Sequence, residues 1–332
     1  MVEQKVVVIT GASAGVGRAA ARAFAAKGAD VGLIARGTAG LAGARRDVEE
    51  YGRRAVEISA DVADAQAMLD AADTVERELG PIDIWVNNAM TSVFAPFWEV
   101  EPEEFRRVTD VTYHGYVNGT RAALRHMRPR DRGTIVMVGS ALAYRSIPLQ
   151  SAYCGAKSAI VGFTDSLRAE LLHEKSSIKL TAVHLPAINT PQFRWVRSRL
   201  PREAQPVPPI FQPELAAEAI VWASEHDRRE IHLAAPTAAA ILGQQFVPAL
   251  LDRYLVSAWE AQMIEEARDP DRPDNLFSPV DDDHGAHGAF DDRARRESPY
   301  WLFDRYRAPI TAATVGIGAA IALAVTLLRP RR

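Results

Sequence analysis

The sequence has little of several features that define whole classes of protein. It holds a single cysteine, Cys154, among 332 residues, which excludes an internal disulfide framework and a multi-cysteine metal site and indicates a reducing compartment. The formal net charge is only -3 and no basic stripe is present, so no nucleic acid partner is expected. The first residues lack the pattern of a secretory signal. With 48% hydrophobic residues, the chain can instead bury one large core or two modest ones.

One long run near the end carries no charge: "ITAATVGIGAAIALAVTLL", residues 310–328. It approaches the roughly 20 residues that a helix needs to cross a bilayer. Aromatic residues and arginines precede it and "RPRR" follows, as is typical of segments at headgroup level. The sequence therefore predicts a transmembrane helix over residues 308–328. The alternative is a buried Ala-rich helix, which would normally have a polar face.

Residues 5–185 alternate short β-branched runs with longer Ala-rich amphipathic stretches, which is typical of a parallel sheet covered by helices on both faces. We expect a doubly wound α/β domain over residues 1–235. Six runs predict strands: "KVVVIT", "DVGLIA", "AVEIS", "IDIWVN", "GTIVMVG" and "IKLTAVHL". The run "EIHLAA" predicts a short seventh strand.

The pattern changes after Pro236. A helical stretch interrupted by Pro248 is followed by an acidic, proline-containing stretch without periodicity, so residues 236–307 are expected to form a helical extension and an acidic tether. His284 and His287 lie beside the aspartates at 281–283 and could be imagined as metal ligands. Such runs are usually solvated loops, so no metal site is predicted.

A glycine-rich loop, "TGASAGVG" at residues 10–17, follows the first expected strand and opens the first helix. Its glycines allow a tight turn and close approach of a pyrophosphate, and the helix N-terminus supplies free N–H groups for the anion. A plain tight turn is the alternative. In this strand–turn–helix context, the loop predicts a dinucleotide site formed by Gly11, Ser13, Ala14, Gly15, Val16 and Gly17.

The end of the second strand indicates which dinucleotide binds. A carboxylate there would accept hydrogen bonds from the adenosine ribose, whereas an arginine would pair with a 2′-phosphate. Ala35 occupies the acid's place and Arg36 follows. We therefore expect NADP(H) rather than NAD(H), the alternative being a surface arginine without a ligand.

Polar and small residues also end the third and fourth strands. Asp61 and Val62 could border the adenine, and Asn88 and Ala89 follow the fourth strand. Because ligands bind outside the carboxyl ends of parallel strands, these positions should converge on one crevice. Ordinary turn chemistry would explain them equally simply.

Tyr153 and Lys157 are spaced i, i+4 and share a helix face. A phenol has an ordinary pKa near 10. A nearby ammonium and a cationic nicotinamide would lower it, so that Tyr153 could serve as acid or base. Ser140, at the end of the fifth strand, could hold the substrate oxygen as charge develops. The pair alone usually marks an amphipathic helix, but the combination with the serine and the glycine loop is specific.

With these residues the sequence resembles the short-chain dehydrogenase/reductase family over about residues 4–235, through "TGASAGVG", Asp61, "NNA", Ser140 and "YCGAK". The resemblance implies a Rossmann-type fold, a nicotinamide cofactor and hydride transfer between its ring and a carbonyl or carbinol carbon. It implies that Tyr153 exchanges the proton, Ser140 positions the substrate, and Lys157 binds the nicotinamide ribose and tunes the tyrosine. Ile188 and Thr190 fit a cofactor-contacting segment. Family members are commonly dimers or tetramers, so a homo-oligomer is expected.

Three positions depart from the family pattern. Thr112 stands where an asparagine usually helps to hold a water in a proton relay, although its backbone carbonyl could still serve. Met90 replaces the last glycine of Asn-Asn-Ala-Gly, and Leu185-Pro186 replaces a Pro-Gly pair. The relay at Thr112 is the step that these departures put in doubt.

The stretch after Thr190 corresponds to the family's substrate lid, residues 190–213, where Phe193, Trp195 and Phe211 suggest an apolar cover. Together with the expected anchor, this favours a hydrophobic alcohol or ketone taken from the membrane, with the catalytic domain in the cytoplasm. A rival interpretation is a catalytically weak NADP(H)-binding regulatory or scaffold protein, supported by Thr112 and Met90. A lyase or epimerase that uses its nicotinamide transiently is a third.

Overall fold

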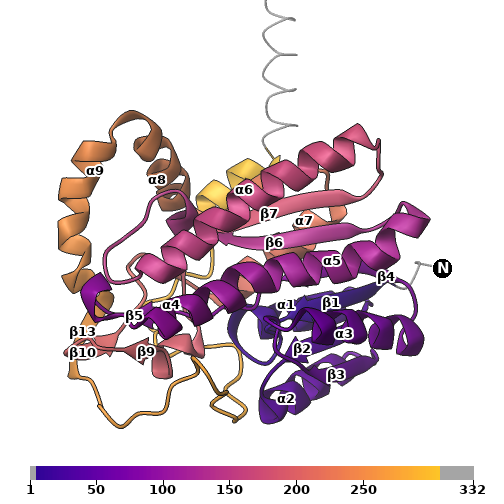
Figure 1. The fold of residues 1–332 in the computed structure, drawn as a ribbon, viewed down its shortest axis with the longest axis horizontal. Helices are drawn as coiled ribbons and strands as arrows, with labels where there is room; N and C mark the ends of the chain where they lie inside the picture. Colours follow the sequence, from indigo (N-terminus) through magenta and orange to yellow (C-terminus); the bar gives the residue numbers. More distant parts are fainter. Residues whose placement is uncertain (1–4, 307–332) are drawn as a thin grey trace, which may run out of the picture.

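A seven-stranded parallel sheet forms the centre of the computed structural model, which describes residues 5–306 (Figure 1). The strand order β12-β7-β6-β4-β1-β2-β3 means that the chain begins in the middle of the sheet and winds outward in both directions. The predicted doubly wound sheet is thereby confirmed. Its strands are β1 Val6–Thr10, β2 Asp30–Ala35, β3 Ala55–Ser59, β4 Ile82–Asn87, β6 Thr134–Ser140, β7 Lys179–Leu185 and β12 Glu230–His232.

Helices cover both faces of the sheet because alternate strand residues enter two separate cores. In β1, Val7 and Ile9 pack with α1, α2 and α7, whereas Val6 and Val8 pack with α3, α5 and α6. The carboxyl ends of the strands therefore meet at one edge, where a ligand can bind. The helices are α1 Gly15–Ala26, α2 Thr38–Glu49, α3 Ala65–Glu78, α4 Pro102–Thr109, α5 Gly115–Met127, α6 Ser151–His173 and α7 Pro213–Glu225.

Short strand pairs organise the loops above this edge. β10 (Arg202–Ala204) pairs with β13 (Met263–Ala267), which ties the predicted lid to the C-terminal extension. The helices α8 (Ala235–Phe246) and α9 (Pro248–Leu255) lie to one side of the sheet (Figure 1). The remaining pairs are β5 Val93–Phe94 with β9 Arg197–Ser198, and β8 Ala187–Ile188 with β11 Ile210–Phe211.

The predicted membrane anchoring requires correction. Within residues 5–306, no helix has both the length and the apolar character needed to cross a membrane. The localisation expected from the sequence, a single-pass C-terminal anchor with a cytoplasmic catalytic domain, is contradicted by this finding. The predicted span itself, residues 308–328, lies outside the described residues.

Candidate active site

The fold brings the predicted serine, tyrosine and lysine together at the carboxyl end of β6. The Ser140 side chain lies close enough to the Tyr153 phenol to lower the pKa of that phenol. The serine Oγ also accepts from the backbone N–H of Leu142 at 3.1 Å. Lys157 lies one helical turn after the tyrosine, with Nζ 5.7 Å from the centre of the Tyr153 ring. A hydroxyl, a phenol and an amine thus share one buried corner of the sheet edge.

Lys157 is held by a residue that the sequence did not single out. Its Nζ donates to the phenol oxygen of Tyr116 at 2.9 Å and to the carbonyl of Val138 at 2.8 Å. The Tyr116 hydroxyl donates in turn to the same carbonyl, also at 2.8 Å. No motif marks Tyr116, because only the packing of α5 against α6 and β6 brings it to the lysine.

Burial dominates the proton affinities of the tyrosine and the lysine. It raises the pKa of Tyr153 well above its usual value, although the interaction with the Ser140 side chain acts in the opposite direction. Burial also lowers the pKa of Lys157 to about 7. The expected lowering of the Tyr153 pKa by the lysine is therefore not found here, since removal from water disfavours both charged forms.

The Thr112 hydroxyl is engaged elsewhere. It donates to the backbone carbonyl of Thr91 at 2.9 Å and accepts from the Thr91 N–H at 3.1 Å, and the side chain is fully buried. The residue belongs to a π-helical turn, Asp110–His114, between α4 and α5. The predicted catalytic threonine therefore uses its hydroxyl to fix the loop after β4.

The glycine-rich loop packs as closely as the sequence predicts. Gly11 has φ +67°, and a Cβ there would lie 2.9 Å from the Ala89 Cα. A Cβ on Gly17 would lie 2.1 Å from the Gly11 carbonyl oxygen. Among the described residues, no side chain caps the start of α1 at Ala14. Asn88 fastens the loop to β4 by donating to the Thr10 carbonyl at 3.0 Å.

The predicted cofactor-contacting segment, which contains Ile188 and Thr190, lies against the same glycine-rich loop. A Cβ on Gly15 would lie 3.1 Å from the Thr190 Cγ2, so these two residues adjoin. Ile188 is buried in β8, just before Thr190. Ser13 lies against α2, where a Cβ on Gly40 would meet the Ser13 Cβ at 2.8 Å.

The acidic stretch expected to be a tether lies across this crevice. We call residues 275–285 the C-terminal strap. The Arg36 guanidinium donates to the carbonyls of Asn275, Leu276 (3.3 Å) and Phe277 (3.1 Å). Burial lowers the pKa of Arg36, with repulsion from Arg107 adding to the effect. The arginine predicted to bind a 2′-phosphate thus donates three hydrogen bonds to backbone oxygens of the strap.

Carboxylates of the strap also bind a helix N-terminus and an arginine near the glycine-rich loop. Asp281 accepts from the Thr38 hydroxyl at 3.0 Å and from the Ala39 N–H at 2.9 Å, at the first turn of α2. Asp283 pairs with the Arg18 guanidinium at 2.9 Å. The strap ends where the Gly285 carbonyl accepts from the Gly15 N–H at 3.0 Å.

The predicted adenine border is likewise closed by protein groups. Asp61 forms an ion pair with Arg107, which also donates to the Leu276 carbonyl at 3.0 Å. Val62 is buried, and its carbonyl accepts from the Asn118 side chain at 3.0 Å. The Leu276 side chain is fully buried in a cluster that includes Val93, Ala95, Val108 and Ala152, with Tyr153 packed against it.

The aromatic residues of the predicted lid face inward. Phe193 joins a buried cluster with Met263 and Phe290 of the extension, and its ring lies 6.0 Å from that of Phe290. The Trp195 ring lies 4.2 Å from that of His284. The lid and the extension therefore form one packed unit.

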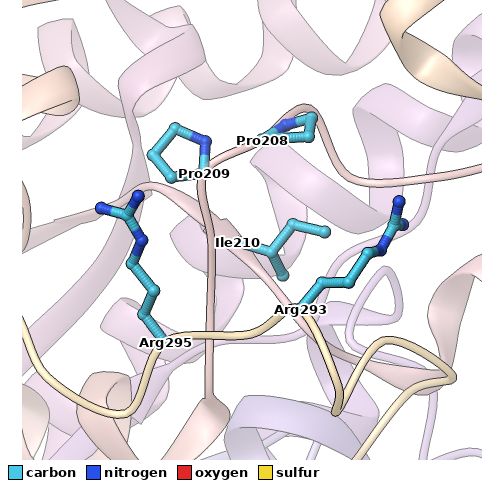
Figure 2. A pocket seen from close by; sticks show the side chains of 5 residues that line it. All are labelled: Pro208, Pro209, Ile210, Arg293 and Arg295. Carbon is cyan, nitrogen blue, oxygen red and sulfur yellow. The ribbon is translucent and has the colours of Figure 1, made fainter.

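A separate pocket of about 420 Å³ lies where β11 meets the end of the extension (Figure 2). Pro208, Pro209 and Ile210 form one wall, and the side chains of Arg293 and Arg295 flank it. The residues predicted for catalysis or cofactor binding are not among its lining residues. The predicted active site at the carboxyl edge of the sheet is therefore distinct from this pocket.

A doubly wound sheet, a glycine loop before α1 and a Ser–Tyr–Lys group together define a dinucleotide-binding α/β oxidoreductase. The chain belongs to the short-chain dehydrogenase family, whose model, described as "short chain dehydrogenase", matches residues 5–200. It is an oxidoreductase of this type, with a fold that binds a nicotinamide cofactor.

Relatives resemble different parts of the chain. The uncharacterized oxidoreductase YxnA of Bacillus subtilis (strain 168) is 34% identical over 320 residues, covering 95% of this chain and 89% of that protein, so its similarity extends into the C-terminal extension. A short chain dehydrogenase from Mycobacterium paratuberculosis bound to NAD is 26% identical, with a TM-score of 0.59. An alcohol dehydrogenase from the archaeon Thermococcus sibiricus complexed with 5-hydroxy-NADP is 25% identical, with a TM-score of 0.60. Each structural match covers 69% of this chain and 95% of the other.

Proposed function

We propose that this protein is an NADP(H)-dependent dehydrogenase or reductase that acts on a carbonyl or a secondary alcohol. The observation that carries the proposal is the proximity of Ser140, Tyr153 and Lys157 at the carboxyl edge of the sheet, where Ser140 interacts with the phenol and Lys157 Nζ lies 5.7 Å from the centre of its ring. The corner is buried, which strengthens electrostatic interactions with a reacting group.

The residues around the glycine loop fit a dinucleotide. Close packing at Gly11 and Gly17 leaves backbone rather than side chains at the start of α1, and the N-terminus of that helix favours an anion. Arg36 would hold a 2′-phosphate, and Asp61, Asn88 and Thr190 would border the rest. NADP(H), when bound, supplies or takes up the hydride.

The preference for NADP(H) rests on Arg36 together with Ala35. Of the two solved relatives described above, one carries NAD and the other an NADP analogue, so they do not decide between the cofactors. A guanidinium pairs well with a phosphate, whereas the carboxylate that would bind a free ribose is missing at position 35.

Tyr153 is the group that exchanges a proton with the substrate oxygen. Because burial keeps its phenol protonated, it is set to donate the proton when a carbonyl is reduced. The Ser140 hydroxyl donates a hydrogen bond to the same substrate oxygen as negative charge develops. Lys157, fixed by Tyr116 and the Val138 carbonyl, keeps a donor beside the phenol.

An apolar substrate suits the surroundings of Tyr153. The buried side chains of the cluster packed with it are valine, alanine and leucine. A hydrophobic substrate that bears the carbonyl or carbinol carbon would take the place of Leu276 against these side chains. A homo-oligomeric assembly stays a prediction from the family.

Tyr153→Phe tests the assigned chemistry. The variant should lose NADPH-coupled turnover of an apolar carbonyl panel by at least about 100-fold, because general acid catalysis contributes 10²–10⁴, while NADPH affinity is retained. Tyr51→Phe, at an exposed site, should behave like the wild type. A wild-type protein that binds NADPH but reduces no carbonyl in the panel would instead favour the rival scaffold interpretation based on Thr112 and Met90.

Arg36→Ala tests the cofactor preference. Losing a charge-assisted contact of about 1.5–3 kcal/mol should weaken NADPH binding by roughly 10- to 150-fold relative to NADH. The ratio of the two affinities is the relevant measurement, because Arg36 also holds the strap and its loss affects both cofactors alike. An unchanged ratio would refute the assignment.

A further inference from the structure

A second group of ionisable side chains lies at the outer edge of the sheet. β12 pairs with β7 in parallel, with His232 opposite His184. Glu230 precedes His232 by two residues and therefore points to the same face. Ile231, between them, enters the opposite core. Two imidazoles and a carboxylate are thus fixed on one face of two adjoining strands.

The distances among these groups are too long for hydrogen bonds. The His184 Nε2 lies 3.6 Å and the His232 Nε2 lies 3.7 Å from the same Glu230 oxygen, Oε2. The three ligand atoms all lie within 4.8 Å of one another. Hydrogen bonds from N–H to oxygen are about 2.7–3.2 Å long. Ligand atoms bound at about 2.0–2.1 Å to a tetrahedral zinc lie about 3.3–3.5 Å apart.

Two buried nitrogens of the group lack a hydrogen-bond partner among residues 5–306, the His184 Nδ1 and the His232 Nε2, whereas the His184 Nε2 lies 3.4 Å from the Tyr144 hydroxyl. A buried polar atom left without a partner costs about 1–3 kcal/mol. A cation between the His232 imidazole and the carboxylate would satisfy the His232 Nε2.

Tyr144 completes the surroundings of the carboxylate. Its hydroxyl donates to the Glu230 Oε2 at 3.0 Å, and its ring contacts the His184 ring edge-on with 5.0 Å between ring centres. Such a donor orients a ligating carboxylate. A cavity of about 10 Å³ lies against Tyr144, Lys157, His184 and Glu230, about the volume that one water-sized species occupies.

We propose that His184, Glu230 and His232 form a zinc site. Two imidazole nitrogens and one carboxylate oxygen favour zinc over magnesium or calcium, which prefer oxygen alone. The ion would fasten β12 to β7 and, through Tyr144, the turn that follows Ser140. None of its ligands takes part in the proposed oxidoreductase chemistry, although Lys157 borders the same small cavity. The site also differs from the His284 and His287 region considered from the sequence.

The histidines considered from the sequence have other partners. The His284 Nε2–H donates to the Val280 carbonyl at 3.0 Å. His287 lies 2.6 Å from an Asp291 oxygen and 2.7 Å from a Glu214 oxygen. Hydrogen-bond lengths of this kind indicate protein partners at those positions, in contrast to the longer spacing around Glu230.

The test is zinc binding by the full chain without a histidine tag, after treatment with a chelator. Calorimetric titration should show one equivalent of Zn²⁺ bound, and thermal unfolding should shift upward with Zn²⁺ but not with Mg²⁺. His232→Ala should weaken binding at least 10-fold and abolish the shift. Its partly exposed side chain makes misfolding of the variant less of a concern than at His184.

His173→Ala supplies the matched control, since this exposed histidine ends α6 away from the group. Glu230→Gln keeps the side chain's size and should also weaken zinc binding at least 10-fold. The proposal is overturned if the wild type binds no stoichiometric zinc, or if His232→Ala and His173→Ala bind it equally well. Because binding and unfolding are measured without substrate, the outcome does not depend on the proposed enzyme activity.

Discussion

Removing the Asp281 carboxylate should tighten the binding of NADPH. Asp281 lies at the first turn of α2, where it accepts hydrogen bonds from the Thr38 hydroxyl and the Ala39 N–H. Arg36, the residue proposed to hold the 2′-phosphate, is bound to the same strap. The strap must therefore release these groups before the cofactor can use them, and Asp281→Ala weakens its hold without altering Arg36.

The size of the effect follows from the contacts that are lost. Two hydrogen bonds to an exposed carboxylate contribute about 0.5 kcal/mol each, well below the value for buried charges. The favourable position at a helix N-terminus adds about 0.3–1 kcal/mol. A total of roughly 1–2 kcal/mol corresponds to a 5- to 30-fold change in the equilibrium between closed and open strap. When the open form is the minor one, the apparent Kd for NADPH falls by the same factor.

The assay is a fluorescence titration of NADPH into the wild type, Asp281→Ala and Asp292→Ala. Asp292 is an exposed aspartate of the extension beyond the strap, so its removal changes the net charge equally without removing a contact to α2. We expect tighter binding only for Asp281→Ala. An unchanged or weaker affinity in that variant would refute competition between the strap and the cofactor.

Two further predictions concern groups that hold the site. Burial raises the pKa of Glu104, but hydrogen bonds from Arg199 and Arg197 outweigh it and lower the pKa to about 2 from 4.5. Its contribution to stability is therefore present above about pH 4.5 and is lost as the pH falls towards 2. Glu104→Gln should lower the unfolding free energy by up to roughly 3 kcal/mol at pH 7. Denaturant titrations measure this loss, with Glu103→Gln at an exposed site as the control. An equal loss of unfolding free energy at pH 2.5 would contradict the prediction. Tyr116→Phe removes a hydrogen-bond acceptor from the Lys157 ammonium, so the Lys157 pKa of about 7 should fall further. The limb of the pH profile of kcat/KM that reports this pKa should move about 1–2 pH units lower. An unshifted limb would show that Tyr116 does not tune the lysine.

Much of the fold could be predicted because its signals are local. The expected strands at 30–35, 55–59 and 82–87 coincide with β2, β3 and β4, and β1 and β6 differ by single residues at their ends. Buried parallel strands form continuous apolar runs bounded by turn residues, which a sequence displays directly. The Ser140, Tyr153 and Lys157 group could be predicted for a similar reason, because strand ends and helix spacing place those residues.

The partners that could not be predicted come from distant parts of the chain. Tyr116 meets Lys157 across 41 residues, and His184 meets Glu230 only because two strands pair in register. The alternation Glu-Ile-His at 230–232 was a usable signal, since it places two ligands on one strand face, but the third ligand lies on another strand. No local rule connects such residues before the strand order is known.

The strap shows how one composition can support two interpretations. Its aspartates and Pro279, without periodicity, indicated a tether, yet Asp281 and Asp283 lie against α2 and Arg18. A site that attracts phosphates through arginines and helix N-termini attracts carboxylates by the same physics. An acidic segment in a chain with a dinucleotide crevice is therefore itself a candidate occupant of that crevice.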